Sequence, residues 1–277
     1  MKTAIVTGAS AGIGKATAKR LHQQGYEVFA GARRVEKMQD LAAIGVHVHA
    51  LDVTDQNSNQ VFVTDVLAQS STIDVIVNSA GYSAQGALED VSPEEAKRQF
   101  DVNVFGLMNL TQLVLPTMRH QRAGKVINIS SIGGQIYSPL GGWYYASKHA
   151  LEALSDTLRM EVKRFGIDVI IVEPSGTKTE WGGIATQKLL DQTPTDSAYR
   201  DIVDRYAKNS GFSNFSTTPD TIADLILKAI TARKPRTRYL PDFTAKLLVF
   251  AARKLPYKAL DRMMFRSLKQ IMAPNNN

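Results

Sequence analysis

Two adjacent tyrosines stand just ahead of a lysine in the segment GGWYYASKHALEAL, residues 141–154. If this segment is helical, Lys148 lies about one turn after both Tyr144 and Tyr145, so its ammonium can approach either phenol. A phenol has a pKa of about 10 and is a poor acid or base at neutral pH, but a neighbouring positive charge favours the phenolate. The spacing alone therefore indicates either acid–base chemistry at one tyrosine or an ordinary surface contact.

A second candidate site is the glycine-rich segment TGASAGIGKATA, which follows the first apolar run of the chain. Gly8, Gly12 and Gly14 stand where a strand would turn into a helix. There the backbone can approach a pyrophosphate, and the free N–H groups at the helix start can receive its charge. The spacing differs from the commoner G-x-G-x-x-G fingerprint, so a tight strand–helix connection is the alternative.

The end of the second apolar run bears on which dinucleotide would bind. A site for NAD usually offers a carboxylate there to the ribose 2′-hydroxyl. This chain has Ala32, Arg33 and Arg34 in that place, and a guanidinium pairs well with a 2′-phosphate. The arginines predict NADP(H), while Glu36 lies close enough to keep NAD(H) open as the alternative.

The elements that position these residues follow from the hydrophobic periodicity. Short β-branched runs occupy 3–8, 27–32, 46–51, 73–80, 125–130 and 168–174, and helical spacing occupies 13–24, 35–43, 57–69, 94–119, 143–165 and 219–232. Nearly all-apolar strands that alternate with helices indicate a parallel sheet covered on both faces. We therefore expect an α/β fold with a single doubly wound, Rossmann-like sheet, whose ligand crevice lies at the carboxyl ends of the strands.

The composition narrows the class of protein. With 277 residues, 44% of them hydrophobic, we expect one domain over residues 1–277, and the lack of cysteine excludes thiol chemistry. We see no signal peptide and no apolar run long enough to span a membrane, so a soluble cytoplasmic protein is expected. The net charge of +7 is concentrated at one end, since residues 233–277 hold 11 Lys and Arg against Asp242 and Asp261.

Several separate motifs together resemble the short-chain dehydrogenase/reductases over about residues 2–232. TGASAGIG resembles the family's cofactor loop, LDVTD its adenine-contacting segment, NSAG its N-N-A-G, YYASK its Y-x-x-x-K pair and EPSGTKT its P-G-x-x-x-T segment. Ser79 and Ser175 depart from these patterns, the latter in place of a glycine. The cofactor contacts that the resemblance implies are Gly8, Ser10, Gly12, Ile13, Gly14, Arg33, Asp52, Val53, Asn78, Ala80, Gly81, Tyr144, Lys148, Pro174, Thr177 and Thr179.

The resemblance also implies catalytic roles. It selects Tyr144 as the acid/base, and the family's serine 13 residues earlier is Ser131, which would bond the substrate oxygen as charge develops. Lys148, together with the positive nicotinamide of the oxidised cofactor, would favour the phenolate and would bind the nicotinamide ribose. Asn103 would hold a water that links Lys148 to solvent. No metal site is expected.

The substrate and partners depend on the C-terminal third. Residues 175–217 are expected to form a substrate lid that carries Trp181, Tyr199, Tyr206, Phe212 and Phe215. Aromatics there favour an apolar substrate, and packing of the loop onto the body is the alternative. The tail and lid look most similar to the 17β-hydroxysteroid dehydrogenase-like branch. That likeness implies a steroid-, retinoid- or acyl-lipid-like ketone or aldehyde and its alcohol.

The basic extension of about 241–277 has two interpretations. Apolar residues at helical spacing among basic ones predict an amphipathic helix that either folds back on the body or a partner subunit, or lies peripherally on an anionic membrane. The apolar residues are Leu260, Met263, Met264, Phe265, Leu268, Ile271 and Met272. We expect a carbonyl-reducing oxidoreductase and a homo-oligomer, with no nucleic-acid partner. A non-catalytic NADP(H)-binding regulator that kept the fold is the alternative function.

Overall fold

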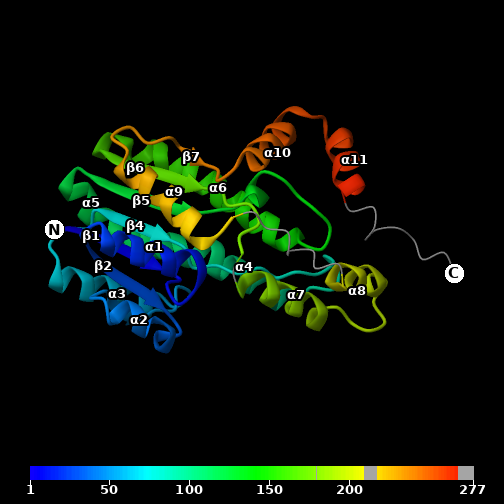
Figure 1. The fold of residues 1–277 in the computed structure, drawn as a ribbon, viewed down its shortest axis with the longest axis horizontal. Coiled ribbons are helices and arrows are strands. Elements are labelled where there is room, and N and C mark those ends of the chain that lie inside the picture. The colour runs from blue at the N-terminus through cyan, green and yellow to red at the C-terminus, as the bar shows by residue number, and fades with distance from the viewer. Residues whose placement is uncertain (179, 209–216, 268–277) are drawn as a thin grey trace.

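The computed structural model describes residues 1–178, 180–208 and 217–267, and they are built around one parallel sheet (Figure 1). In the described chain the strand order is β3-β2-β1-β4-β5-β6-β7. The six expected strands are present, and a short seventh, β7, pairs with β6. The strands are β1 (Lys2–Thr7), β2 (Tyr26–Ala32), β3 (His47–Ala50), β4 (Val75–Asn78), β5 (Gly124–Ile129), β6 (Ile167–Val172) and β7 (Arg238–Tyr239).

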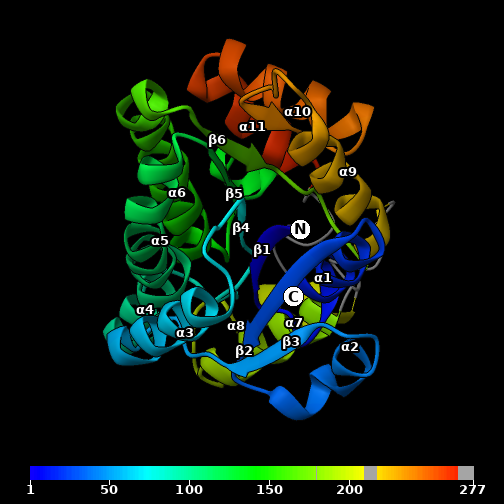
Figure 2. The ribbon, with the colours of Figure 1, turned by 90° about the vertical axis from the view of Figure 1, so that its left-hand side faces the viewer.

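Helices cover both faces of this sheet (Figure 2) because its strands are apolar on both. One face packs against α1 (Gly12–Gln23), α2 (Gln39–Ala42) and α9 (Pro219–Thr231). The other packs against α3 (Gln56–Gln69), α5 (Leu107–Gln121) and α6 (Gly142–Val162). Alternation along β1 shows the division, since Ala4 and Val6 join the first core and Ile5 joins the second. The expected doubly wound class is confirmed.

The helix expected over 94–119 is interrupted. Ser92 caps the start of α4 (Pro93–Phe100), since its hydroxyl accepts a hydrogen bond from the Glu95 amide. A π-helical turn, η2 (Asp101–Gly106), then joins it to α5. Such single π turns inside α-helices occur frequently at functional sites. This one contains Asn103.

The expected lid contains two helices in its described part, α7 (Glu180–Gln192) and α8 (Arg200–Lys208). Buried Leu189 and Val203 pack with Ala87 and Leu140 in a separate small core, so these helices are held on the loops at the carboxyl end of the sheet. Thr179, Phe212 and Phe215, which the sequence placed in the cofactor site and the lid, lie outside the described residues, as does the Trp181 side chain.

The C-terminal extension forms α10 (Phe243–Lys254) and α11 (Tyr257–Ser267). Asp242 caps α10, since its carboxylate accepts a hydrogen bond of 2.7 Å from the Ala245 amide. Buried Ala245, Val249 and Leu260 face the body of the molecule, so the described part of the extension folds back on it. No described helix is long and apolar enough to cross a membrane. Leu268, Ile271 and Met272 of the expected amphipathic helix lie outside the described residues.

Candidate active site

The crevice for a ligand lies where the strand order reverses, between β1 and β4. The loops that follow these two strands are joined by Thr7, whose hydroxyl accepts hydrogen bonds of 3.0 Å from the amides of both Ser79 and Ala80. The glycine-rich loop after β1 and the NSAG segment after β4 are therefore fixed side by side.

Two glycines of the loop are required by close backbone contacts. Gly8 has a φ of +66°, and a Cβ there would lie 2.9 Å from the Ala80 backbone. A Cβ on Gly14 would lie 2.5 Å from the Gly8 carbonyl oxygen. At Ala11, where α1 begins, no side chain caps the helix. The first N–H groups of α1 can therefore receive a phosphate, and Gly12 and Ile13 lie in this first turn.

Arg34, rather than Arg33, reaches the glycine-rich loop. Its guanidinium donates a hydrogen bond of 3.2 Å to the hydroxyl of Ser10, and both arginines are exposed at the end of β2. A guanidinium and a hydroxyl held together beside the pyrophosphate loop suit a 2′-phosphate. Arg34 is thus a candidate cofactor contact beside Arg33, although only Arg33 stands among the contacts that the resemblance implies.

The segment after β3 is held by its own hydrogen bonds. The Asp52 carboxylate accepts hydrogen bonds from the amide and hydroxyl of Thr54, and the Val53 carbonyl accepts a hydrogen bond of 2.9 Å from the Asn59 side chain. Asn78, by contrast, turns its side chain inward, where it donates to Thr111 and Asn128. The Asn78 side chain therefore ties β4 to α5 and β5, and any cofactor contact there would come from its backbone.

Ser131, Tyr144 and Lys148 lie together at the carboxyl end of β5. Ser131 follows β5, and its hydroxyl bonds the Tyr144 phenol, which stands in the first turn of α6. The Lys148 Nζ lies 5.9 Å from the centre of the Tyr144 ring and donates 2.9 Å to the Ile129 carbonyl. Tyr145 packs edge-on against Tyr144 and bonds Ser138 instead. The serine contact thus distinguishes the two tyrosines and favours Tyr144.

Burial dominates the electrostatics of this group. It raises the pKa of Tyr144 to about 12, although the Ser131 hydrogen bond acts in the lowering direction. Burial also lowers the pKa of Lys148 to about 8, against the pull of the Glu152 carboxylate. The protein groups alone therefore leave the phenol protonated at neutral pH, and the lowering expected with an oxidised nicotinamide stays a prediction.

Asn103 lies beside this group because of the π turn. Its side-chain amide donates to the Tyr82 carbonyl and to Ser147, and its Oδ1 accepts from the Tyr82 amide at 3.1 Å. A Cβ on Gly81 would meet both Asn103 Oδ1, at 3.1 Å, and Lys148 Nζ, at 3.9 Å. Asn103 and Lys148 therefore face the same small space, as a relay between them requires.

Comparison with known proteins shows the family to which a chain with this geometry belongs. A family model described as short chain dehydrogenase matches residues 2–189. The chain belongs to the short-chain dehydrogenase/reductase family. Among its relatives, the probable short-chain type dehydrogenase/reductase VdlC of Helicobacter pylori is 35% identical over 272 residues, 96% of this chain and 99% of the relative.

Two further relatives of this dehydrogenase/reductase have names that state a reaction. The 3-ketodihydrosphingosine reductase of Bacteroides thetaiotaomicron is 38% identical over 198 residues, 71% of each chain. The NADPH-dependent 3-dehydrocapnine reductase of Ornithobacterium rhinotracheale is 32% identical over 283 residues, 98% of this chain and 99% of the relative.

Solved structures agree with the fold. A short-chain dehydrogenase from Streptomyces avermitilis superposes with a TM-score of 0.80 at 31% identity, covering 98% of this chain and 96% of that one. An alcohol dehydrogenase from Thermococcus sibiricus complexed with 5-hydroxy-NADP gives 0.71 at 26% identity, covering 87% and 95%.

The loop after β6 explains one departure of this dehydrogenase/reductase from the family pattern. Ser175 stands in place of a glycine, and its hydroxyl donates 2.9 Å to the Asp242 carboxylate that caps α10. The Pro174 carbonyl accepts a hydrogen bond from the Ile132 amide, and the hydroxyls of Thr177 and Thr217 share a hydrogen bond of 3.2 Å. The serine therefore ties the loop expected at the nicotinamide to the C-terminal extension.

A cavity of about 440 Å³ lies beside Tyr145. One wall carries Leu88, Tyr137, Ser138, Pro139, Gly142, Tyr145, Ala146 and His149, and the other is α11, with Asp261, Met264 and Phe265. The Tyr137 hydroxyl donates 2.9 Å to Asp261 and joins the two walls. Since Tyr145 lines this cavity and packs against Tyr144, the cavity adjoins Tyr144.

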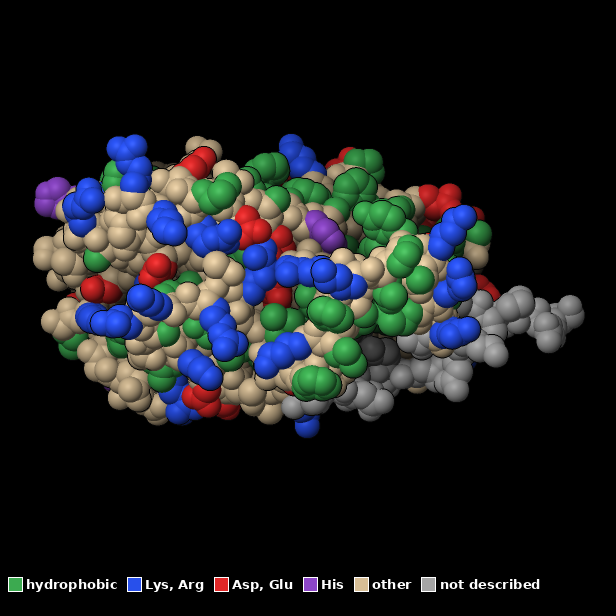
Figure 3. All heavy atoms as spheres, turned by 90° about the horizontal axis from the view of Figure 1, so that it is seen from above, with side chains coloured by type: hydrophobic (Ala, Val, Ile, Leu, Met, Phe, Trp, Pro, Cys, Tyr) green, Lys and Arg blue, Asp and Glu red, His purple; other side chains and the backbone are tan. Residues whose placement is uncertain are grey.

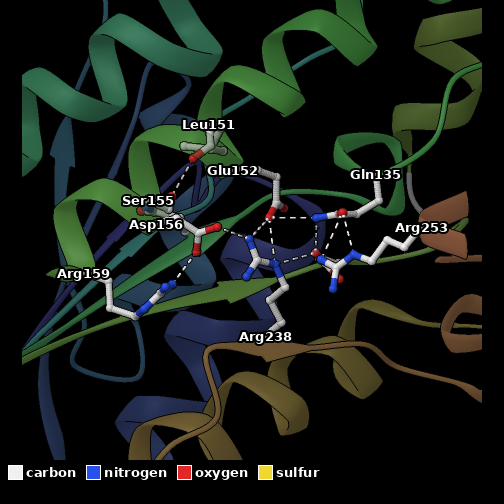
Figure 4. A network of polar contacts seen from close by, with 10 residues as sticks. Gln135, Leu151, Glu152, Ser155, Asp156, Arg159, Arg238 and Arg253 are labelled. Carbon is white, nitrogen blue, oxygen red and sulfur yellow. Dashed lines mark hydrogen bonds and ion pairs between the residues drawn. The ribbon is translucent and has the colours of Figure 1, made fainter. Parts of the chain in front are cut away.

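A polar network lies around Glu152 (Figure 4), which comes one helical turn after Lys148 on α6. Glu152 from α6 and Glu173 at the end of β6 both face Arg238 of β7, with closest nitrogen–oxygen distances of 2.9 Å and 3.2 Å. Gln135 donates to both carboxylates, at 3.1 Å and 3.0 Å. The sequence-based assignment missed this network, and its one signal was the acid one turn after Lys148.

Proposed function

We propose that the chain is an NADP(H)-dependent oxidoreductase that interconverts an apolar ketone or aldehyde and its alcohol, with Tyr144 as the acid/base. The observation that carries the proposal is the hydrogen bond between Ser131 and Tyr144, with Lys148 one turn behind, at the carboxyl end of the sheet. When bound, the cofactor supplies or accepts the hydride.

The residues of the chain divide the remaining work. As the carbonyl oxygen gains charge, the Ser131 hydroxyl stabilises it by a hydrogen bond and the Tyr144 hydroxyl delivers the proton. The Lys148 ammonium favours the phenolate that is left behind. Asn103 and Lys148, which face one small space, then return a proton to Tyr144 from solvent.

NADP(H) over NAD(H) is supported by the charge at the end of β2. Ser10 and Arg34 are already in contact there, and Arg33 adds a second positive charge. Gly8 and Gly14 let the loop pack closely on neighbouring backbone, and the uncapped start of α1 within it offers free N–H groups to a pyrophosphate. One relative is named as NADPH-dependent, and one similar structure holds 5-hydroxy-NADP.

An apolar substrate is supported by the cavity beside Tyr145. Its size of about 440 Å³ falls within the usual range for small-molecule sites, and its walls are mostly apolar, including Leu88, Met264 and Phe265. Two relatives are named for 3-keto substrates, 3-ketodihydrosphingosine and 3-dehydrocapnine. A ketone or aldehyde carried on an apolar body is the class of substrate that fits both observations.

A cytoplasmic enzyme in peripheral contact with a membrane is supported by the outer face of the extension (Figure 3). Phe243, Leu247 and Phe250 follow each other at helical spacing on α10 and are 77%, 55% and 62% exposed. Exposed basic residues lie among the apolar ones: Lys246, Arg253, Lys254, Lys258, Arg262 and Arg266. Apolar area joined to basic charge suits an anionic lipid surface, which would also supply the substrate. Homo-oligomerisation stays an expectation.

The two tyrosines provide the test of the proposal. We expect Tyr144→Phe to lower kcat by at least about a hundredfold while NADPH still binds, because it removes only the transferable proton. Tyr145→Phe, the matched control, is expected to keep most of the activity. The assay is NADPH oxidation with steroid, retinal, long-chain 3-keto and sugar carbonyls. The opposite ranking of the two variants would refute Tyr144, and NADPH binding without turnover of any carbonyl would favour the regulator.

A further inference from the structure

We infer that Glu152 is a positioning residue that acts through Lys148: its carboxylate, held by Arg238 and Gln135, keeps the lysine ammonium charged beside Tyr144. This inference rests on the proposed function, because it concerns the same acid/base group. It also gives the C-terminal extension, which contributes part of the hold on Glu152, a role inside the active site.

The helix spacing places these residues in one row. Tyr144, Lys148, Glu152 and Asp156 follow each other at intervals of four on α6, so they share one face of the helix. Lys148 and Glu152 are only 7% and 5% exposed. A buried ammonium needs a neighbouring negative charge to stay ionised, and among the groups near Lys148 it is the Glu152 carboxylate that supports its positive charge.

The contacts in the network distinguish Glu152 from Glu173. Arg238 faces Glu152, Glu173 and Asp156, and Asp156 is itself paired with Arg159 nearer the surface. Two buried carboxylates therefore share one guanidinium, which favours a proton on one of them. Arg238 bonds Glu152 through two nitrogens, at 3.0 Å and 2.9 Å. Burial and the nearby Glu152 raise the pKa of Glu173 to about 7, so Glu173 is the carboxyl group in the network that favours a proton.

The hold on Glu152 continues into the C-terminal extension. Arg253 on α10 donates two hydrogen bonds, of 3.1 Å and 3.0 Å, to the side-chain oxygen of Gln135. That contact turns the Gln135 nitrogen toward the two carboxylates. Gln135 ends the short helical turn η3 (Ile132–Gly134) that begins at Ser131, so the same bonds steady the serine that contacts Tyr144.

The competing explanation is that Glu152 merely anchors Arg238 for stability. Asp156 separates the two explanations because it also binds Arg238, at 2.7 Å, but lies one turn farther from Lys148. Loss of either acid would loosen Arg238. Only loss of Glu152 would remove the charge next to Lys148.

The experiment compares Glu152→Gln with Asp156→Asn by titrating Lys148 itself. Protein labelled with ¹³C at the lysine ε position is followed by NMR, and the Lys148 signal is assigned from its absence in Lys148→Arg. We expect Glu152→Gln to lower the Lys148 pKa from about 8 by roughly two units, the effect of a unit charge about one helical turn away at an effective protein dielectric of about 20. Asp156→Asn is expected to leave it in place.

A steady-state readout accompanies the titration. The alkaline limb of the kcat/KM profile is expected to move to lower pH in Glu152→Gln, because the ammonium is lost sooner, and to stay in Asp156→Asn. Equal Lys148 titrations in the two variants would overturn the inference. If Glu152→Gln does not fold, Glu152→Asp, which withdraws the charge by one methylene, is expected to shift Lys148 less in the same direction, and no shift would refute it. A wild type without carbonyl turnover would refute the proposed function alone, since the NMR result is independent of activity.

Discussion

Glu173 offers a sharp test of the buried network because its ionisation is coupled to folding. The side chain is fully buried, its Oε1 accepts from Gln135, and its Oε2 has no hydrogen-bond partner among the described residues. Burial, helped by the Glu152 charge, raises its pKa from 4.5 to about 7. Between these two values the unfolded chain releases a proton that the folded chain keeps. The glutamate therefore makes the fold less stable as pH rises through this window.

The magnitude follows from the size of the shift. Between two and three pKa units, at about 1.4 kcal/mol each, correspond to about 3 kcal/mol of unfolding free energy lost from pH 4.5 to above pH 7. Glu173→Gln keeps the shape and removes the titration. Relative to wild type, the variant is therefore expected to gain about 3 kcal/mol between pH 5 and pH 8.

Urea unfolding followed by circular dichroism at pH 5, 6, 7 and 8 measures this difference. Asp156→Asn is the control. Burial acts to raise the pKa of Asp156, but hydrogen bonds from Arg238 and Arg159 outweigh it and lower the pKa. Asp156 is thus ionised in both states above pH 5, and its variant should differ from wild type by a constant amount. A Glu173→Gln difference that is equally flat would refute the buried proton.

Three further outcomes are expected. Arg34→Asp should lower kcat/KM for NADPH far more than for NADH, and each tenfold change in that ratio corresponds to about 1.4 kcal/mol. Its effect on NADPH should also exceed that of Arg33→Asp. A wild type that already prefers NADH would contradict the assignment. Gly14→Ala should abolish NADPH binding, measured by fluorescence, because its Cβ would lie 2.5 Å from the Gly8 carbonyl oxygen; unchanged affinity would refute the backbone cradle. Wild type should cosediment with anionic vesicles at low salt and release as salt rises, whereas Leu247→Glu combined with Phe250→Glu should not bind; binding that survives in this folded variant would exclude the α10 face.

Much of the fold was predictable because periodicity and burial coincide. Six strands and the helices around them fall where apolar runs and helical spacing place them, since a parallel sheet buries both of its faces. β7 was not predicted because it consists of only Arg238 and Tyr239 and is too short to show a hydrophobic period. The π turn escaped because its sequence, DVNVFG, continues an ordinary helical pattern on either side.

The candidate site was predictable as far as local motifs reach. The structure brings Ser131, Tyr144 and Lys148 together with Asn103 as the motifs imply, although their roles stay proposals. The glutamate network was not predictable, because Glu152, Gln135 and Arg253 come from separate elements that only the folded chain joins. The choice of Arg34 over Arg33 also depended on the local turn rather than on residue type.

The π turn has a consequence for how this chain tolerates insertions and deletions. Gln99, near the end of α4, donates to the Tyr82 carbonyl and accepts from the Ala84 amide. Asn103, within the π turn, accepts from the Tyr82 amide. Removing one residue between them would let α4 and α5 merge into one regular helix, but it would shorten the spacing between Gln99 and Asn103 from four residues to three and change their relative direction. The segment that follows β4 would then lose one of its two holds. We therefore expect gaps to be excluded from this stretch, even though a shorter, straighter helix would have better hydrogen bonds.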